Sequence, residues 1–304
     1  MSDIALGIAA SAASVDSVFG QVNQALKNKK YYAALRQLSG LSIQYSKDIT
    51  FLTYLSETQK GLQDFTNLLK THSEIVRQRG HAEDHLNLMR SYYKLNFRNE
   101  ALDVGLNLQS QKLSVTQEMQ VGELLIKIYL EENDFEGAQE TILRLSKFKA
   151  TDFMYWAQGV VLLNLDQKDK ALECFRHAVE LNPENDQAWV SLGMMHKDMG
   201  DDDLHVANIE KAIDVNPYNS SALKQLTNSM GRKQDKMEAV FDSVRYYLKE
   251  HCFDEDISLC HLQMLCQTKQ WGLAEFEMEK LILDQPHSEM FKNIKKSMFE
   301  LQTM

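Results

Sequence analysis

DFMYWAQGVVLLNLDQKDKALECFRHAVELNPEN, residues 152–185, and DQAWVSLGMMHKDMGDDDLHVANIEKAIDVNPYN, residues 186–219, are two units of equal length built on one plan. A step of 34 residues joins identical residues of the two units: Gly159 and Gly193, Ala178 and Ala212, Asn182 and Asn216, and Pro183 and Pro217. The remaining proline, Pro286, lies 69 residues beyond Pro217, which is two such steps plus one residue. This period, with proline closing the units, indicates an array of helix-turn-helix repeats.

The composition agrees with a nearly all-helical chain. The 304 residues include only three prolines and 13 glycines, the two residue types that break helices. No run of alternating Val, Ile and Thr between turn residues predicts a strand. With 44% hydrophobic and 25% charged residues, the chain has the composition of a globular protein with a substantial core.

The charge and the apolar segments limit the classes of partner. A net charge of -10 argues against nucleic-acid binding, which needs Lys and Arg to neutralise phosphates. No stretch approaches the ~20 apolar residues of a membrane span, and the Ala/Ser-rich segment 1–14 lacks the basic start of a secretory signal. The four cysteines have no paired spacing, as in proteins of a reducing compartment, so we expect a cytoplasmic protein.

The two units resemble the tetratricopeptide repeat (TPR) family. The positions that carry the resemblance are Gly159, Ala171, Phe175, Ala178, Pro183, Trp189, Leu192, Gly193, Ala212 and Pro217. Each glycine falls where the two helices of a unit cross, and Phe175 and Ile209 would be large side chains that fill the space between helix pairs. This chain departs from the family pattern at Gln158 and His205. We expect looser packing at both positions. The resemblance implies an all-α, right-handed superhelical solenoid of stacked repeats that acts as a non-enzymatic scaffold for protein–protein interaction.

Weaker copies of the repeat extend the array in both directions. The predicted organisation has an apolar N-terminal segment (1–14), a TPR-like repeat (15–47), a degenerate helical repeat or one long helix (48–79), two degenerate repeats (82–151), two well-formed repeats (152–219), two degenerate repeats (220–287) and a capping helix (288–304).

The resemblance also implies a partner-binding groove along the first helix of each unit. Its positions fall on Phe153, Trp156, Val160, Leu163, Val190, Met194 and Lys197, with Arg90 and Lys127 upstream. Apolar groove residues with a polar rim are suited to a peptide or amphipathic helix. The sequence leaves open whether Trp156 faces the groove or packs inside the array.

One specialised TPR function does not fit the groove positions. Co-chaperones that hold the acidic tail of heat-shock chaperones use Lys and Asn there as a carboxylate clamp. This chain has Trp156, Val160, Ser191, Ser221 and Gln225 instead, so we expect no clamp. The apolar groove is more similar to that of TPR chaperones of bacterial secretion systems.

A second interpretation is assembly of the chain with itself through its apolar ends, because an array with open ends needs caps. The candidate residues are Ile4, Leu6, Met290, Phe291, Ile294 and Met298. Met290, Ile294 and Met298 share one stripe of the last helix, whereas Phe291 and Phe299 fall off it, so we expect these two rings to be exposed.

Other residue clusters carry weaker signals. His251, Cys252, Cys260, His261 and Cys266 gather in sequence but match no familiar zinc spacing, so we interpret them as packing residues and expect no metal. The acidic turn Asp201–Asp203 lacks the EF-hand pattern and is expected to cap the next helix. Neither a GxxxxGK[ST] loop nor a GxSxG elbow is present, and we predict no catalytic residues and no cofactor.

Overall fold

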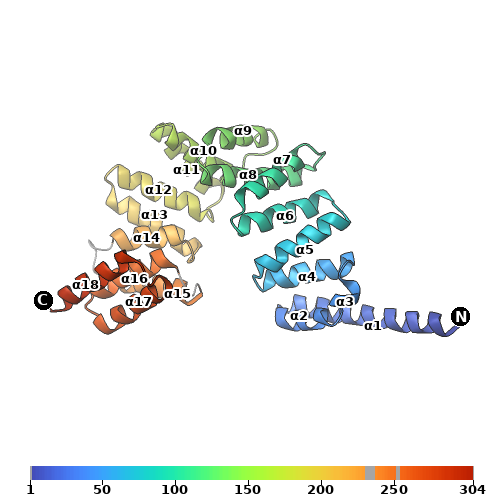
Figure 1. Ribbon diagram of the computed structural model, residues 1–304. Helices are drawn as coiled ribbons and strands as arrows, with labels where there is room; N and C mark the ends of the chain where they lie inside the picture. The colour runs from blue at the N-terminus through green and yellow to red at the C-terminus, as the bar shows by residue number, and fades with distance from the viewer. Residues whose placement is uncertain (1, 230–236, 251–253, 304) are drawn as a thin grey trace. The chain divides into compact units, whose positions relative to one another are not determined.

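The computed structural model describes the backbone of residues 2–229, 237–250 and 254–303, and the side chains of these residues apart from 2–14, 43, 237, 239, 250 and 303. Every regular element in these ranges is a helix, and successive helices are joined by short turns (Figure 1). None of these helices combines the length and the apolar character needed to cross a bilayer. The chain divides into two compact units, Met1–Ala150 and Thr151–Met304.

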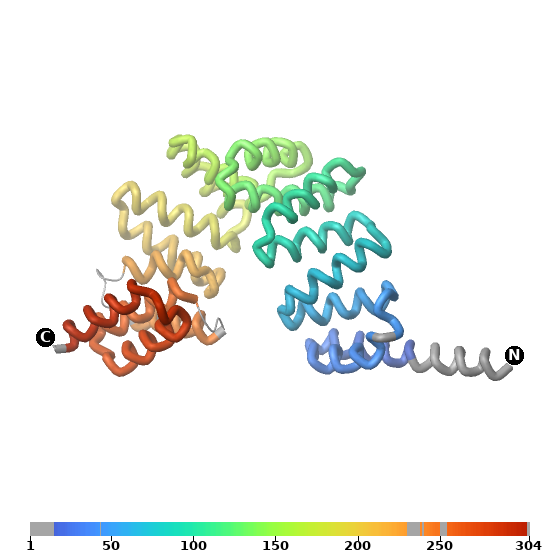
Figure 2. Tube along the Cα trace, in the orientation of Figure 1, coloured from blue at the N-terminus to red at the C-terminus, as the bar shows by residue number. Residues whose placement is uncertain are grey.

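Unit 1 is a stack of helical hairpins, and we call the first helix of each hairpin its A helix and the second its B helix (Figure 2). The A helices are α1 (Ser2–Lys27), α4 (Ile49–Gly61), α6 (Ala82–Lys94) and α8 (Val115–Glu131), and the B helices are α2 (Tyr31–Ser39), α5 (Phe65–Gln78), α7 (Arg98–Gln109) and α9 (Phe135–Leu145). A short helix, α3 (Ser42–Tyr45), links the first two hairpins.

Unit 2 repeats this plan and adds one helix at its end. The A helices are α10 (Asp152–Asn164), α12 (Asp186–Asp198), α14 (Ser220–Ser229) and α16 (Glu255–Gln267), and the B helices are α11 (Lys168–Leu181), α13 (Asp202–Val215), α15 (Met237–Glu250) and α17 (Trp271–Asp284). The last helix, α18 (Glu289–Thr303), packs against α17. The all-α solenoid class predicted from the repeat period is therefore confirmed.

A left-handed backbone residue marks the turn between the A and B helices. It recurs at nearly constant spacing at Lys29, Gln63, Asn96, Asn133, Asp166, Gly200 and Lys269. Only the turn between α14 and α15 lies outside the described residues. Because a left-handed conformation reverses the chain within a few residues, the repeat period is present in the backbone even where the side chains have diverged. Gln63 places 48–79 in the same phase, and this stretch forms two helices rather than one.

The predicted packing roles of the glycines and prolines are confirmed. A side chain on Gly159 would meet the ring of Phe175, which is completely buried. Gly193 receives Ile209 in the same way. The helices α11, α13 and α17 each end two residues before Pro183, Pro217 and Pro286, respectively.

Two expectations from the sequence are wrong. Phe291 was expected to be exposed but is fully buried in the core of unit 2. Helix α18 turns Phe291, Ile294 and Met298, which is 5% exposed, towards α17. Met290 and Phe299 remain exposed. His205 does not loosen its repeat: its ring contacts the carbonyl oxygen of Gly193 and the hydroxyl of Ser229, both at 2.9 Å.

Candidate functional site

The predicted groove residues of unit 2 form a row along two neighbouring A helices. We call this the apolar row: Phe153, Trp156, Val160 and Leu163 on α10, and Val190 and Met194 on α12. All six side chains are half-buried. The fully buried face of α10 instead holds Met154, Ala157 and Val161. The row therefore rests on the core and keeps part of its apolar surface in contact with solvent.

Trp156 is fixed within this row by two contacts. Its indole Nε1 donates a hydrogen bond to the hydroxyl of Ser191 on α12 at 3.1 Å. The centroids of the Phe153 and Trp156 rings are 5.6 Å apart. Lys197, one turn beyond Met194, donates to Gln225 of α14 at 3.0 Å. The indole thus bridges two repeats with its polar edge satisfied, and the sequence alone did not indicate the role of Ser191.

A second set of hydrogen bonds joins the start of each A helix to the turn that leads into the next A helix, and it uses residues that the sequence reasoning missed. The Asp152 carboxylate accepts hydrogen bonds from the side-chain amides of Asn182 and Asn185, both at 2.9 Å. Asp186 of the next repeat accepts from Asn216 and Asn219 at 2.7 and 2.8 Å. All three positions keep the 34-residue step, which was a usable signal. These hydrogen bonds connect the start of one A helix with the turn before the next.

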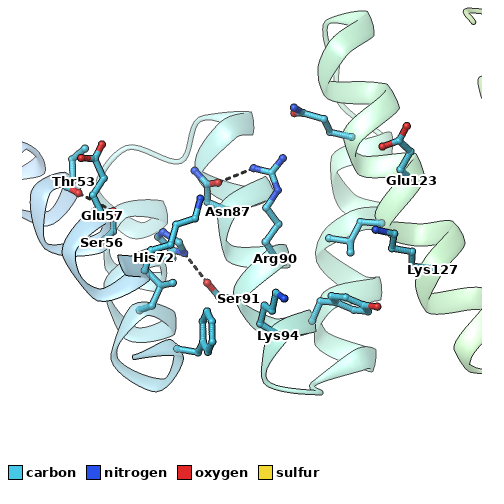
Figure 3. A pocket seen from close by; sticks show the side chains of 16 residues that line it. Thr53, Ser56, Glu57, His72, Asn87, Arg90, Ser91, Lys94, Glu123 and Lys127 are labelled. Carbon is cyan, nitrogen blue, oxygen red and sulfur yellow. Dashed lines mark hydrogen bonds between the residues drawn. The ribbon is translucent and has the colours of Figure 1, made fainter. Parts of the chain in front are cut away.

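Unit 1 contains a cavity of about 600 Å³ on the corresponding face of its A helices (Figure 3). This volume lies within the ~300–1,000 Å³ usual for ligand pockets. The lining residues come from α4 (Thr53, Ser56, Glu57, Lys60), α5 (Phe65, Leu68, His72), α6 (Asn87, Arg90, Ser91, Tyr93, Lys94) and α8 (Gln120, Glu123, Leu124, Lys127). The structure thus brings together Arg90 and Lys127, the two upstream groove residues predicted from the sequence.

Most of the residues that line this cavity are polar, and together they carry an excess of positive charge. Four cationic side chains, Lys60, Arg90, Lys94 and Lys127, outnumber two carboxylates, Glu57 and Glu123. Arg90 donates to the Asn87 side-chain carbonyl at 3.0 Å and lies 3.7 Å from Glu83 outside the cavity. The cavity is therefore chemically distinct from the apolar row of unit 2.

His72 contributes no charge to this cavity at neutral pH. Burial, opposed in part by a hydrogen bond to the Asn87 backbone, lowers the pKa of His72 to about 4. Its Nδ1 lies 2.7 Å from the hydroxyl of Ser91 (Figure 3). Ser91 is only 2% exposed, so a ligand in the cavity has no access to that hydroxyl, and the pair serves to connect α5 with α6.

One edge of the cavity is held by a network that joins three helices. The Tyr93 hydroxyl of α6 donates to Glu131 of α8, which also accepts from Arg98 of α7 at 2.8 Å. Burial and this hydrogen bond to a carboxylate raise the pKa of Tyr93. The phenol therefore remains a neutral donor, and it fixes the edge of the pocket.

The other candidate residues do not form a site. Ile4 and Leu6 have side chains outside the described part, as do His251 and Cys252. Among the described residues no group of His, Cys, Asp and Glu is arranged to hold a metal ion. Burial raises the pKa of the thiols of Cys260 and Cys266. Asp201 caps α13 by accepting from the Leu204 N–H at 3.0 Å, as the sequence predicted.

Comparison with known proteins identifies the repeat. Two family models described as tetratricopeptide repeat match residues 153–185 and 186–219. Among curated proteins, the chain is 35% identical over 71 residues to cell division cycle protein 27 homolog of Caenorhabditis elegans, covering 23% of this chain and 9% of that protein. It is 28% identical over 122 residues to human protein O-mannosyl-transferase TMTC1, covering 38% and 14%. The matches thus span only a small part of each relative.

Solved structures share the fold at low sequence identity. The chain resembles one from the APC/C hetero-tetramer Cut9–Hcn1, with a TM-score of 0.56 and 10% identity over 80% of this chain and 48% of that one. It also resembles pilF of Pseudomonas aeruginosa, with a TM-score of 0.51 and 14% identity over 71% of this chain and 97% of that one. The fold, the repeat period and the two matched segments agree, and the chain contains tetratricopeptide repeats at residues 153–185 and 186–219.

Proposed function

We propose that this protein is a non-enzymatic interaction scaffold that binds a peptide or helix of a partner protein on the A-helix faces of its repeats. The observation that carries the proposal is the apolar row of unit 2, in which six apolar side chains are half-exposed on two successive A helices. Aromatic side chains with a fixed orientation commonly dominate binding energy, and Trp156 and Phe153 have that character. The partner segment would bury them, with Lys197 at the polar rim.

The local structure supports this interpretation over simple packing. The Nε1 of Trp156 already has an acceptor in Ser191, so burial of the indole face by a ligand leaves no polar group unsatisfied. The Asp–Asn bridges hold consecutive repeats in a fixed geometry, which lowers the entropic cost of binding. The three described cysteines are free, which supports a location in a reducing compartment such as the cytoplasm.

The test begins with peptides selected from a displayed random library on the intact protein, and measures their dissociation constants by fluorescence anisotropy. We expect apolar sequences that bind at least tenfold more weakly to a Met194→Asp variant and to a Trp156→Asp variant. The matched controls are Leu181→Asp and Met199→Asp, exposed apolar residues of the same two repeats outside the row. Equal affinity of the row variants and the controls contradicts the proposal.

A second candidate function, self-assembly, has its own supporting observation. The two last helices carry large exposed apolar side chains, with exposed fractions of 62% for Phe276, 79% for Leu283 and 64% for Phe299. A second copy of the chain could cover them. Light scattering during size-exclusion chromatography measures the mass, and a Leu283→Ser and Phe299→Ser double variant should shift an oligomer towards the 35.0 kDa monomer. A wild-type monomer at all concentrations refutes this candidate.

A further inference from the structure

The cavity of unit 1 has a charge that the rest of the chain does not share. Its lining carries four cations and two carboxylates, whereas the whole chain has a net charge of -10. Among the described residues, Lys60 and Lys94 form no ion pair. Both lysines are exposed and line the cavity. A ligand that brings carboxylates to them would add ion pairs without breaking any at these two lysines.

The cations are distributed over three A helices. Lys60 is on α4, Arg90 and Lys94 are on α6, and Lys127 is on α8; Figure 3 shows α6 with residues of α4 and α8 on either side. An α-helix with its side chains is about 10–12 Å across, which sets the scale of the step from one A helix to the next. A single carboxylate cannot reach cations on all three helices, so the ligand must carry several negative groups. An extended polypeptide advances about 3.3–3.6 Å per residue, and about three residues therefore span the step from one helix to the next.

We propose that the unit 1 cavity binds an extended acidic polypeptide segment whose Asp or Glu side chains recur at about every third residue. The negative charges come from side chains along the segment rather than from a chain terminus. This inference relies on the proposed function only in that the A-helix faces bind polypeptide. It concerns different residues from the apolar row, and the two surfaces are tested separately.

The uncharged lining favours a polypeptide over a nucleic acid. The side chains of Asn87 and Gln120, with the hydroxyls of Thr53 and Ser56, offer both donors and acceptors for peptide N–H and C=O groups. Glu57 and Glu123 can accept from backbone N–H groups, whereas a phosphodiester backbone has no such donor. The net charge of the chain also opposes a long polyanion.

The experiment measures binding of a fluorescein-labelled peptide that repeats Asp-Ser-Gly, acetylated and amidated so that only side chains are charged. Fluorescence anisotropy with the full chain should show saturable binding that weakens at least fivefold between about 50 and about 300 mM NaCl, because exposed ion pairs are screened. A peptide with the same composition but with all Asp residues adjacent should bind at least threefold more weakly, and an Asn-Ser-Gly repeat should not bind.

The variant that tests the site is Lys60→Gln with Lys94→Gln, and the matched control is Lys112→Gln with Lys149→Gln. The control pair is exposed, lies in the same unit, changes the net charge equally and is outside the cavity. We expect at least a tenfold loss of affinity for the first variant and less than a twofold change for the control. Circular dichroism should show equal helix content in both variants.

Several results would overturn the inference: equal losses in both lysine pairs, binding of the neutral repeat, or tighter binding of an oligothymidylate than of the acidic peptide. A free C-terminal carboxylate on the neutral peptide that restores binding would also reject it in favour of terminal recognition. Failure here combined with Trp156-dependent binding of apolar peptides would reject only the acidic site. The converse pattern, acidic binding without any effect of the apolar-row variants, would reject only the proposed role of the row.

Discussion

Gly159→Ala should destabilise unit 2 although alanine is the better helix former. A Cβ at this position would lie 2.5, 2.7 and 2.9 Å from Cε1, Cδ1 and Cζ of the Phe175 ring. Carbon atoms in contact normally lie about 3.5–4.0 Å apart. The ring is completely buried, so it has no free space into which it could move. Either the ring must leave its rotamer or α10 must move away from α11.

The size of the effect follows from two opposing contributions. Overpacking a well-filled core costs about 1–3 kcal/mol, and replacing glycine by alanine inside a helix returns about 1 kcal/mol. Three ring atoms collide at once, so we place the cost in the upper part of its range and expect a net loss of about 1–2 kcal/mol. At Gly193 a Cβ would lie 2.8 and 3.0 Å from Cδ1 and Cγ1 of Ile209 and 3.3 Å from the His205 carbonyl oxygen, so Gly193→Ala should also be destabilising.

Denaturant unfolding followed by tryptophan fluorescence measures this change. All three tryptophans, Trp156, Trp189 and Trp271, lie in unit 2, so the signal reports on that unit. Gly272→Ala is the control, because nothing lies within 4 Å of its Cβ, and it should be neutral or gain up to about 1 kcal/mol.

Adding Phe175→Leu to Gly159→Ala should recover part of the loss, giving a coupling energy of about 1 kcal/mol in a double-mutant cycle. If Gly159→Ala is as stable as the wild type, or more stable, then the close approach of α10 and α11 through Phe175 is not what fixes this repeat.

Three further predictions concern other parts of the fold. Asp186→Ala leaves the side-chain amides of Asn216 and Asn219 without their acceptor and should lower the free energy of unfolding of unit 2 by about 1–3 kcal/mol. The control Asp214→Ala, at an exposed ion pair, should change it by less than about 0.5 kcal/mol in the same fluorescence assay. Phe291→Ala should cost about 3–5 kcal/mol because the ring is fully buried, and Phe299→Ala, 64% exposed, should be nearly neutral; equal effects would mean that α18 does not pack as described. Unit 1 should lose stability as the pH falls from about 6.5 towards about 4, since the unfolded state binds a proton at His72 that the native state does not; His72→Gln should flatten that part of the pH profile measured by circular dichroism.

The fold was predictable because its determinants are local and periodic. Gly159, Phe175 and Pro183 act within one repeat, and the same step brings their counterparts into the next, so a single sequence contains the comparison needed to recognise them. The terminal helix was less predictable. Met290 and Phe291 are both apolar and adjacent, and the helical period alone does not indicate which face meets α17; only the position of α17 decides that Phe291 is buried.

The apolar row was predictable in position but not in exposure. Helix α10 has apolar residues on several faces, so its pattern could not separate Trp156 from the buried Met154 and Val161. The partner that satisfies the indole, Ser191, lies 35 residues away on the next A helix. A polar residue one repeat further along is a signal for such a contact only when the spacing between A helices is already known.

The unit 1 cavity shows the limit of reading each repeat separately. The stretch 48–79 has no recognisable repeat phase in its side chains, yet the left-handed turn at Gln63 places α4 where its Lys60 joins Arg90 and Lys127 at one surface. Backbone phase is therefore retained here after the consensus residues are lost, because the turn and the buried contacts need only a suitable backbone and apolar side chains. The A-helix surface is then free to vary in charge from repeat to repeat. A single chain can in this way combine an apolar row in one unit with a cationic cavity in the other, and the degenerate repeats, rather than those that best fit the family, are where such differences should be sought.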